Sequence, residues 1–320
     1  MGNSKSIILA DPDSESWDFA CNVYEKIKQR DENNISIGKV EITRFNDGES
    51  YVHIAENVRG KNCFFVHDCG KNPNDWLIEL MLVNDALKRA SAALVTDILP
   101  YMKYSRQDRK HVSRVPVSAR VIADSIGYRA DRVMTTDLHA DQIQGFYNKP
   151  FDNLYAFPIL IKYLKEKYAE FLKNSIVIAP DAGGVHRARA FAKRIDKEIA
   201  IIDKRREKAG EVAGMNIVGE VEGKNAIIVD DMIDTGGTLI EACKALKKNG
   251  AQDVFACCTH AVFSKNAEQM LSEVFDKVIV SDSIPKKMNN NKVDIVSLAE
   301  LYAEAIYRIN EGLSLSELFE

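Results

Sequence analysis

The chain has 320 residues, more than a single hydrophobic core usually supports, so we expect two domains of about 150 residues each. Apolar residues make up 46% of the chain and charged residues 28%, with a net charge of -4. This balance gives no basic excess that would indicate a nucleic-acid or anionic-membrane partner, and no apolar run approaches the roughly 20 residues that span a bilayer. Any anionic ligand must therefore meet local clusters of Lys and Arg.

The six cysteines are scattered along the chain, with no CxxC pair and no secretory apolar segment at its start. They indicate a reducing, cytoplasmic location and buried thiols, not metal ligands. Residues 1–6 fit the myristoylation pattern M-G-x-x-x-[ST]. So short a pattern also arises by chance, and a frayed terminus is the alternative.

Short apolar runs, most of them rich in Val and Ile, alternate with helical patterns along the chain. They predict strands at 6–10, 39–45, 62–67, 92–99, 132–136, 175–179, 199–202, 225–229, 253–259 and 277–280. The helical patterns are at 14–29, 75–90, 117–126, 186–194 and 238–249. Strands that alternate with helices imply a mostly parallel sheet with helices on both faces, which is an α/β fold.

No low-complexity or Pro-rich linker divides the chain. Counting strands places the domain boundary near residues 155–158. We therefore expect an N-terminal domain at 1–155, possibly completed by 302–320, and a C-terminal domain at 156–301. No motif repeats at a fixed period, so any similarity between the two halves must be structural.

The sharpest signal is the segment 226–238, in which an apolar strand runs into Asp230 and Asp231, then into a Gly-containing loop and a helix start. The backbone N–H groups of such a loop bind anions, and the hydroxyls of Thr235 and Thr238 add donors. The two carboxylates can accept hydrogen bonds from a ribose diol. The segment is not a P-loop, because it has no Gly-Lys-Ser/Thr. It predicts a sugar-phosphate site, and a turn with acidic caps is the alternative.

This segment resembles the phosphoribosyl-diphosphate loop of the type I phosphoribosyltransferase fold. Three further segments narrow the resemblance to the ribose-phosphate diphosphokinases, in particular their phosphate-regulated, hexameric class: 100–110 resembles the ATP-side segment of that family, 137–147 its signature and 180–184 its second metal segment. The similarity runs in the same order from about residue 43 to 319. It implies two type I phosphoribosyltransferase-like domains and transfer of the β,γ-diphosphate of ATP to the 1-hydroxyl of ribose 5-phosphate.

The resemblance also implies where the substrates bind. The N-terminal domain is expected to bind ATP through Phe45, Asp47, Gly48, Glu49, Arg106, Gln107 and Asp108. The C-terminal domain is expected to bind ribose 5-phosphate through Asp230, Asp231, Asp234, Thr235, Gly236, Gly237 and Thr238. These residue types suit the roles, since an aromatic ring can stack on adenine and an Arg guanidinium offers a planar fork to phosphate. For the ATP-side residues, a charged surface loop is the alternative.

The resemblance further implies a magnesium ion held by His139 and Asp181, the first beside a strand end and the second just after one. It assigns catalysis to Lys204 and Arg206, and leaves Arg205 without a role. The polar stretch 207–214 contains two glycines, and we expect it to close over the substrates as a lid that excludes water.

Two other functions remain open at this point. A salvage phosphoribosyltransferase would use the same sugar-phosphate loop, although the segment with Arg106 and Gln107 argues against it. A catalytically silent regulatory relative would carry insertions or losses near the lid, and none is present between 202 and 229.

Three residues depart from the pattern of the family. Tyr147 stands where Phe is usual and Asn148 where an acid is common, which puts a metal or water role there in doubt. Asp141 replaces a small residue or proline in the loop that is associated with regulation by phosphate. Its negative charge predicts an altered sensitivity to phosphate.

Overall fold

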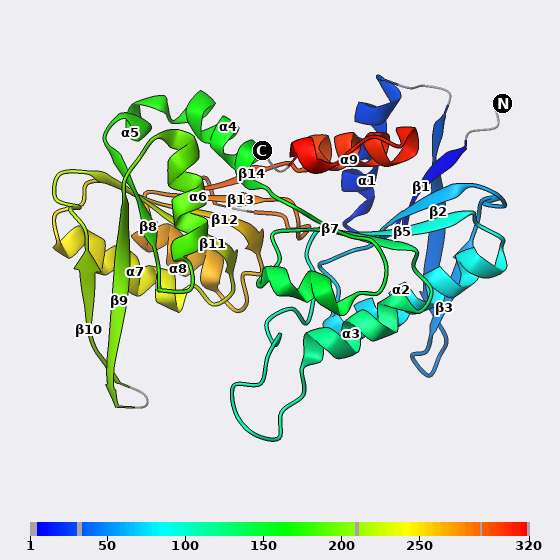
Figure 1. Ribbon diagram of the computed structural model, residues 1–320, viewed down its shortest axis with the longest axis horizontal. Helices are drawn as coiled ribbons and strands as arrows, with labels where there is room; N and C mark the ends of the chain where they lie inside the picture. Colours follow the sequence, from blue (N-terminus) through cyan, green and yellow to red (C-terminus); the bar gives the residue numbers. More distant parts are fainter. Residues whose placement is uncertain (1–4, 31–33, 209–210, 289, 319–320) are drawn as a thin grey trace. The chain divides into compact units, whose positions relative to one another are not determined.

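A computed structural model describes residues 5–30, 34–208, 211–288 and 290–318, and for 204–208 and 211–215 it describes the backbone alone. The chain forms two compact units (Figure 1). The first comprises Met1–Tyr155, Ser283–Lys286 and Leu298–Glu320, and the second comprises Ala156–Asp282 and Lys287–Ser297. The sequence does not indicate that residues 283–286 belong to the first unit. The ligand that each half binds stays a prediction.

The first unit is built on a seven-stranded sheet in the order β3-β2-β1-β4-β5-β6-β7, in which only the edge strand β3 is antiparallel to its neighbour. Its elements are β1 (Ser6–Ala10), α1 (Trp17–Lys28), β2 (Ile35–Arg44), β3 (Ser50–Ile54), β4 (Asn62–Val66), α2 (Pro73–Arg89), β5 (Leu94–Leu99), α3 (Ser118–Gly127), β6 (Arg132–Thr136), η1 (Asp141–Phe146), β7 (Phe151–Leu154), α9 (Ala299–Glu311) and η2 (Ser316–Leu318).

The second unit repeats this arrangement with a sheet in the order β10-β9-β8-β11-β12-β13-β14, again with one antiparallel edge strand, β10. Its elements are α4 (Phe157–Lys167), α5 (Ala169–Lys173), β8 (Ser175–Ala179), α6 (Val185–Ile195), β9 (Ile199–Lys208), β10 (Glu211–Val218), β11 (Asn225–Ile233), α7 (Gly237–Lys248), β12 (Val254–Ala261), α8 (Ala267–Val274), β13 (Lys277–Ser281) and β14 (Val293–Val296).

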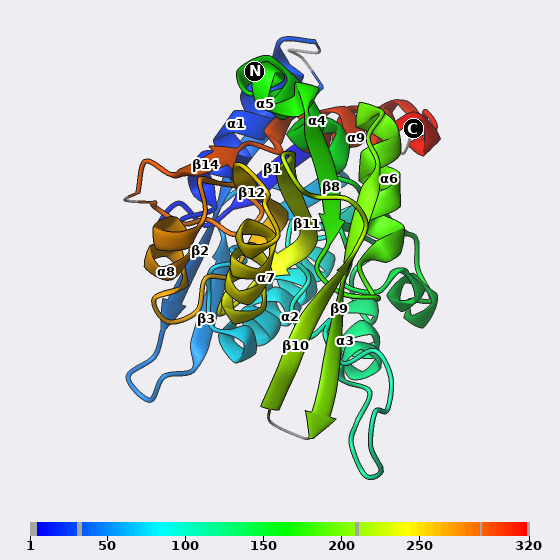
Figure 2. The ribbon, with the colours of Figure 1, turned by 90° about the vertical axis from the view of Figure 1, so that its left-hand side faces the viewer.

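Helices cover both faces of each sheet, as parallel strands that are apolar on both sides require. In the first unit, α2 and α3 pack on one face through a core that includes Trp76, Leu80 and Ile122. Helix α1 lies on the opposite face, and α9 returns from the far end of the sequence to pack beside it (Figure 1). In the second unit, α7 and α8 cover the face of the sheet that bears Ile176 and Ile228 (Figure 2).

The strand predicted at 199–202 is longer in the structure, and much of the polar stretch expected after it is also in strands. Strand β9 continues to Lys208 and pairs with β10 in antiparallel register, with Lys204 opposite Met215 and Arg206 opposite Val212. The charged residues 204–208 form no apolar alternation, so the sequence pattern did not predict this edge hairpin. The closing motion of this segment stays a prediction.

The expected fold class is confirmed, because each unit is an α/β layer structure around a mostly parallel sheet. Parallel strands place all their carboxyl ends at one edge of a sheet, which is where ligands bind in this architecture. No helix among the described residues is both long and apolar enough to cross a membrane.

Candidate functional site

In the second unit, the predicted sugar-phosphate segment follows the buried strand β11 at the carboxyl edge of the sheet. Gly236 is buried and has φ +75°, a conformation that a side chain would strain, and a Cβ there would lie 3.2 Å from Leu271. The N-cap residue of α7 is Gly236, which has no side chain that could cap the helix, so the first N–H groups can bind an external acceptor. Thr235, Gly237 and Thr238 are exposed beside them. The loop has the chemistry of a phosphate site.

Asp230 and Asp231 lie at the end of β11, next to this loop, and share one cation. Nη1 of Arg187, on α6, lies 3.5 Å from Oδ1 of Asp230 and 3.3 Å from Oδ1 of Asp231. Burial raises the pKa of Asp230, the charge of Asp231 raises it further, and Arg187 opposes both effects. Two adjacent acids with one cation form an acceptor pair suited to a vicinal diol. Sequence reasoning missed Arg187, whose only signal is its position six residues after Asp181.

Asp234 and Asp181 complete the acidic groups at this edge. Asp234 is half-buried, and its backbone oxygen accepts from the N–H of Ser264. Asp181 is exposed after β8, and its Oδ1 accepts from the N–H of Gly184 at 2.9 Å. Because β8 and β11 are neighbours in the sheet, Asp181 belongs to the same edge as Asp230.

The expected roles of Lys204 and Arg206 concern side chains that lie outside the described residues. Their backbone belongs to β9, which pairs with one side of β8, whereas β11 pairs with the other side of β8. The roles of both residues stay predictions.

In the first unit, the predicted adenine contacts lie in the hairpin between β2 and β3. Phe45 is 56% exposed and meets Tyr51 edge-on, with 5.6 Å between the ring centroids. Asp47 and Glu49 are exposed, and Oδ1 of Asp47 accepts from the N–H of Glu49. Gly48 has φ +96°, which closes the turn. An exposed aromatic ring can stack on a base, and the nearby acids can accept from its amine.

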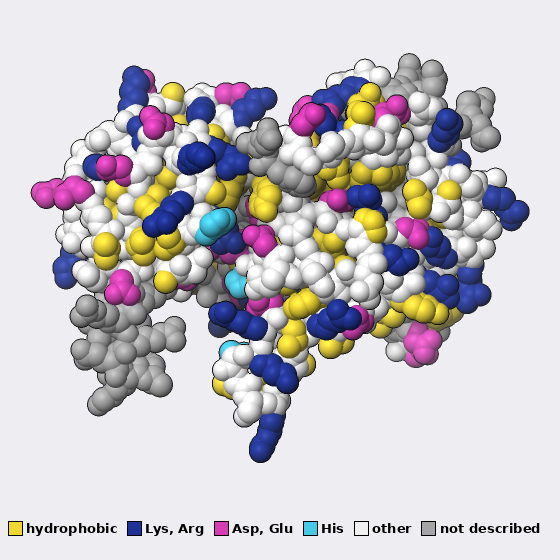
Figure 3. Space-filling model, viewed as in Figure 1, with side chains coloured by type: hydrophobic (Ala, Val, Ile, Leu, Met, Phe, Trp, Pro, Cys, Tyr) yellow, Lys and Arg dark blue, Asp and Glu magenta, His cyan; other side chains and the backbone are white. Residues whose placement is uncertain are grey.

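The second ATP-side segment is the long loop between β5 and α3. Figure 3 shows Lys and Arg side chains along this loop. Arg106 and Arg109, which belong to it, are exposed. The Oε1 atom of Gln107 accepts from the hydroxyl of Ser118, which leaves its amide as a donor, and Asp108 accepts from Nε2 of Gln142. Arg106 and Gln107 therefore offer donors to an anion, whereas Asp108 already serves a contact inside the unit.

The signature segment follows β6 at the same edge of the first sheet. His139 is exposed, and two residues before it Asp137 has φ +39°, a strained value for a residue with a side chain. Asp141 is exposed at the start of η1, and its Oδ1 accepts from the amide of Asn153 at 3.2 Å. Tyr147 is buried and Asn148 is exposed.

Magnesium needs few ligands from the protein. Among the described residues, no three His, Cys, Asp or Glu side chains form a cluster that could hold a metal by themselves. Magnesium is commonly bound through one or two protein oxygens together with substrate phosphates and waters. Oδ2 of Asp181 is a carboxylate oxygen of the kind that such a site uses, and the metal role of the exposed His139 stays a prediction.

The first unit contains a loop in the position that the sugar-phosphate loop has in the second, namely between β4 and α2. In this loop, side chains of the loop itself accept hydrogen bonds from its backbone N–H groups. Oδ1 of Asp68 accepts from the N–H of Gly70 at 2.7 Å, and Asn72 caps α2 by accepting from the N–H of Asn74. This loop therefore lacks the open helix start that makes α7 suitable for phosphate.

Comparisons with known proteins identify the family of the chain. The model of the N-terminal domain of ribose phosphate pyrophosphokinase matches residues 14–128, and that of the phosphoribosyl synthetase-associated domain matches residues 205–320. A ribose-phosphate pyrophosphokinase of Vibrio parahaemolyticus is 48% identical over 310 residues, which is 94% of this chain and 98% of that protein. One from Ralstonia nicotianae is 49% identical over 292 residues, or 89% and 92%.

The chain belongs to the ribose-phosphate pyrophosphokinase family.

A solved structure of this family supports the assignment. The phosphoribosylpyrophosphate synthetase from Mycobacterium smegmatis superposes with a TM-score of 0.86 at 36% identity, covering 96% of this chain and 100% of that one. The resemblance to the ribose-phosphate pyrophosphokinases, and the expectation of an enzyme of this kind, are confirmed. The match extends over both units, which a salvage phosphoribosyltransferase with a single such domain does not explain.

Proposed function

We propose that the chain transfers the β,γ-diphosphate of ATP to the 1-hydroxyl of ribose 5-phosphate, giving 5-phosphoribosyl 1-diphosphate and AMP for nucleotide, histidine and tryptophan synthesis. Membership of the ribose-phosphate pyrophosphokinase family along nearly the whole chain supports this reaction. The observation that carries the substrate assignment is the uncapped start of α7 beside the paired carboxylates of Asp230 and Asp231.

Ribose 5-phosphate binds at this loop. The N–H groups at the start of α7 and the hydroxyls of Thr235 and Thr238 hold the 5-phosphate, with Asp234, Gly236 and Gly237 shaping the turn. Asp230 and Asp231 accept from the two ribose hydroxyls and so orient the sugar. The pKa of Asp230 is raised without ligand. Hydrogen-bond donors favour the charged form of a carboxyl, so a bound diol lowers this pKa.

ATP binds at the carboxyl edge of the first sheet. Phe45 stacks on adenine, and Asp47, Gly48 and Glu49 surround its edge. Arg106 makes charge-assisted contacts with the phosphates, Gln107 adds its amide, and Asp108 holds the segment through Gln142. These side chains are exposed or half-buried without ligand, as a nucleotide site on a surface loop requires.

Magnesium is the proposed cofactor, with His139 and Asp181 as its side-chain ligands. When bound, it supplies positive charge to the oxygens of the diphosphate that is transferred. Lys204 and Arg206 supply further positive charge to the same oxygens. Phosphoryl transfer depends mainly on such neutralisation and on in-line positioning, so the mechanism needs no general base.

The partners follow from the same proposal. ATP and ribose 5-phosphate are the ligands, and neither nucleic acid nor a membrane is a partner. A homo-oligomer, a hexamer by resemblance to the phosphate-regulated class, and a cytoplasmic location belong to this proposal.

One assay tests the reaction. The purified chain is incubated with ATP and Mg²⁺, with and without ribose 5-phosphate, and AMP and the sugar diphosphate are quantified by chromatography. We expect both products in equal amounts, only when the sugar phosphate and the metal are present. If no AMP forms, the silent regulatory relative is the better description. If phosphoribosyl diphosphate and a free base react while ATP does not, the salvage enzyme is correct.

A further inference from the structure

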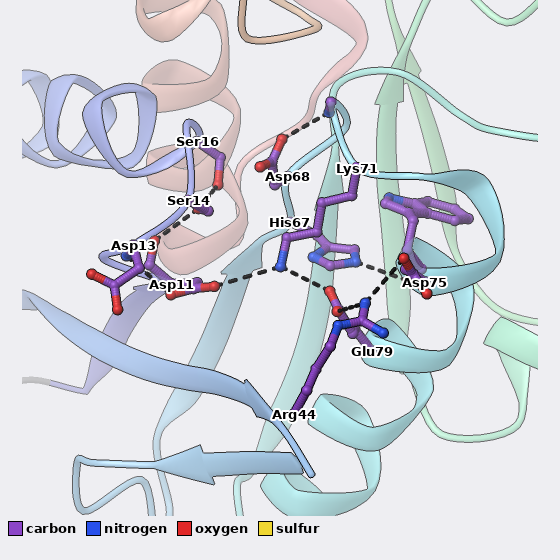
Figure 4. Close-up of polar contacts among 12 residues, drawn as sticks. Asp11, Asp13, Ser14, Ser16, Arg44, His67, Asp68, Lys71, Asp75 and Glu79 are labelled. Atoms are coloured by element: carbon purple, nitrogen blue, oxygen red, sulfur yellow. Dashed lines mark hydrogen bonds and ion pairs between the residues drawn. The ribbon is translucent and has the colours of Figure 1, made fainter. Parts of the chain in front are cut away.

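Arg44, the last residue of β2, links the predicted nucleotide-binding hairpin to helix α2 (Figure 4). Its Nη1 donates to the backbone oxygen of Gly48 at 3.1 Å. Its Nη2 lies 3.0 Å from Oδ2 of Asp75 and 3.4 Å from Oε1 of Glu79. One guanidinium therefore joins the tip of the turn to the first two turns of a helix that packs on the sheet.

Glu79 is a firm anchor for this link, because its side chain is only 3% exposed. A carboxylate buried to this extent is costly unless it is paired. Its second oxygen accepts from Lys71 at 2.8 Å, and Lys71 also reaches Asp11 at 3.5 Å, in the loop after β1 (Figure 4). Withdrawal of Arg44 would leave one oxygen of Glu79 without this cation.

The part of α2 that carries Glu79 is itself held in place. Trp76 is fully buried, and the ring of His67 stacks on it with 5.9 Å between centroids. The Nε2 atom of His67 lies 2.8 Å from the backbone oxygen of Trp76, so the neutral ring donates to it. Burial lowers the pKa of His67 to about 3, which keeps the ring neutral at physiological pH.

The other polar contacts of the turn are local. The N–H of Gly48 donates to the backbone oxygen of Phe45, and the N–H of Glu49 donates to Asp47. These bonds shape the turn but do not connect it to α2. Strand β3, which continues from the turn, is the edge strand, and its one partner among the strands that the structure describes is β2. The side chain of Arg44 thus carries the polar connection between the tip and the helix.

We propose that Arg44, held by Glu79, is a positioning residue that fixes the orientation in which Phe45 and Glu49 meet the adenine of ATP. The inference rests on the proposed function of the hairpin in nucleotide binding. Without the link, the tip must be ordered when the nucleotide binds, which weakens binding. The sugar-phosphate site lies in the other unit, so its affinity should not depend on Arg44.

Steady-state kinetics of Arg44→Met and Glu79→Gln test this proposal. We expect the KM for ATP to rise about tenfold in Arg44→Met and less in Glu79→Gln, in which Asp75 still pairs with Arg44. In both, kcat at saturating ATP and the KM for ribose 5-phosphate should stay within about twofold, which is the pattern of lost uniform binding. The double variant should resemble Arg44→Met, because loss of Arg44 already breaks the link. Arg44→Lys keeps the charge without the fork and should be intermediate.

Arg89→Met is the matched control. Arg89 lies on the same helix, 75% exposed, and pairs with Asp85. It should change neither KM. An unchanged KM for ATP in Arg44→Met would overturn the proposal. So would equal losses for both substrates together with a lowered melting temperature, since these indicate a structural role.

Direct titration of each variant with ATP alone separates this inference from the proposed function. If the wild-type chain binds ATP but forms no AMP, the proposed reaction fails, and a tenfold weaker Kd in Arg44→Met still supports the positioning role. If the wild-type chain makes the products and Arg44→Met binds ATP normally, the positioning role fails alone. If the wild-type chain does not bind ATP, both fail.

Discussion

The guanidinium of Arg187 lies 3.3 Å from Oδ1 of Asp231, a side chain that is almost completely buried at the end of β11. The same nitrogen lies 3.5 Å from Oδ1 of Asp230, so one cation serves two adjacent acids. Burial and the charge of Asp231 both raise the pKa of Asp230. The folded chain thus keeps an arrangement that opposes its own stability, which is typical of a functional site.

Asp230→Asn should separate activity from stability. The pKa of Asp230 is higher in the folded chain than its unfolded value of about 3.9. Asp230 therefore lowers the stability of the chain at pH values above about 3.9, and this effect disappears as the pH falls toward that value. The variant should therefore melt at a higher temperature than the wild type at pH 8, with a smaller difference at pH 5.

The same variant should lose activity about a hundredfold or more, because the amide cannot accept from the ribose diol as the carboxylate does. Thermal denaturation and the AMP assay measure the two effects. Asp253→Asn, an exposed acid of the same unit, is the control. A variant that is both less stable and fully active would contradict this role for Asp230.

Lys204→Ala should reduce turnover about a thousandfold, since a cation at the transferred group acts mainly in the transition state. Affinity for ATP, measured by titration, should remain close to that of the wild type. Arg205→Ala is a matched control, because Arg205 is its neighbour in β9 and has no assigned role. Near-normal turnover of Lys204→Ala would exclude the proposed role.

Asp97 should make the free energy of unfolding of the first unit depend on pH. It is fully buried in β5, accepts from the amide of Asn84 at 2.9 Å, and burial raises its pKa to about 8. Between about pH 4 and pH 8 the unfolded chain releases this proton and the folded chain keeps it. The contribution of Asp97 to stability therefore falls as the pH rises, by at most about 1.4 kcal/mol per pH unit.

Asp97→Asn removes this titration and should flatten the dependence. We expect the variant to gain stability relative to the wild type from pH 5 to pH 8, as measured by urea denaturation. Its amide can also donate to Oδ1 of Asn84, which has no hydrogen-bond partner in the part of the chain that the structure describes. A difference between the two proteins that does not change with pH would show that Asp97 is charged in the folded state.

Asp141→Ser tests the regulatory departure from the family pattern. Asp141 is exposed, so removal of its charge should strengthen phosphate binding nearby by about threefold, the scale of an exposed ionic interaction. The phosphate concentration for half-maximal activation should fall accordingly, and inhibition by ADP should become stronger. Asp124→Ser, on α3, is the control. An unchanged response to both ligands would contradict the hypothesis.

The sequence predicts those elements whose neighbours along the chain determine them. Strands β1, β6 and β8 begin and end where their apolar runs do, because a strand buried on both faces reads as a continuous apolar segment. The open loop at Gly236 is also visible in the sequence, since glycines after a buried strand favour a tight turn into a helix.

Other elements depend on partners that the sequence does not show. Strands β3 and β10 are edge strands, and each is held by pairing with the strand before it. Arg187 joins the site because α6 crosses beside β11, and the link from Arg44 to Glu79 joins residues 35 positions apart. Such contacts follow from the tertiary arrangement, not from local propensity.

The position of α9 has a consequence for how the protein is made. This helix packs on α1, with the ring of Tyr302 edge-on to Phe19 and its hydroxyl 2.6 Å from that of Thr136. The ribosome synthesises α9 only after the whole second unit. During synthesis, one face of the first sheet therefore lacks α9 until the end of the chain is made. The second unit has all its elements before that point. We expect the second unit to complete its fold first, which is the reverse of the usual N-terminal-first order.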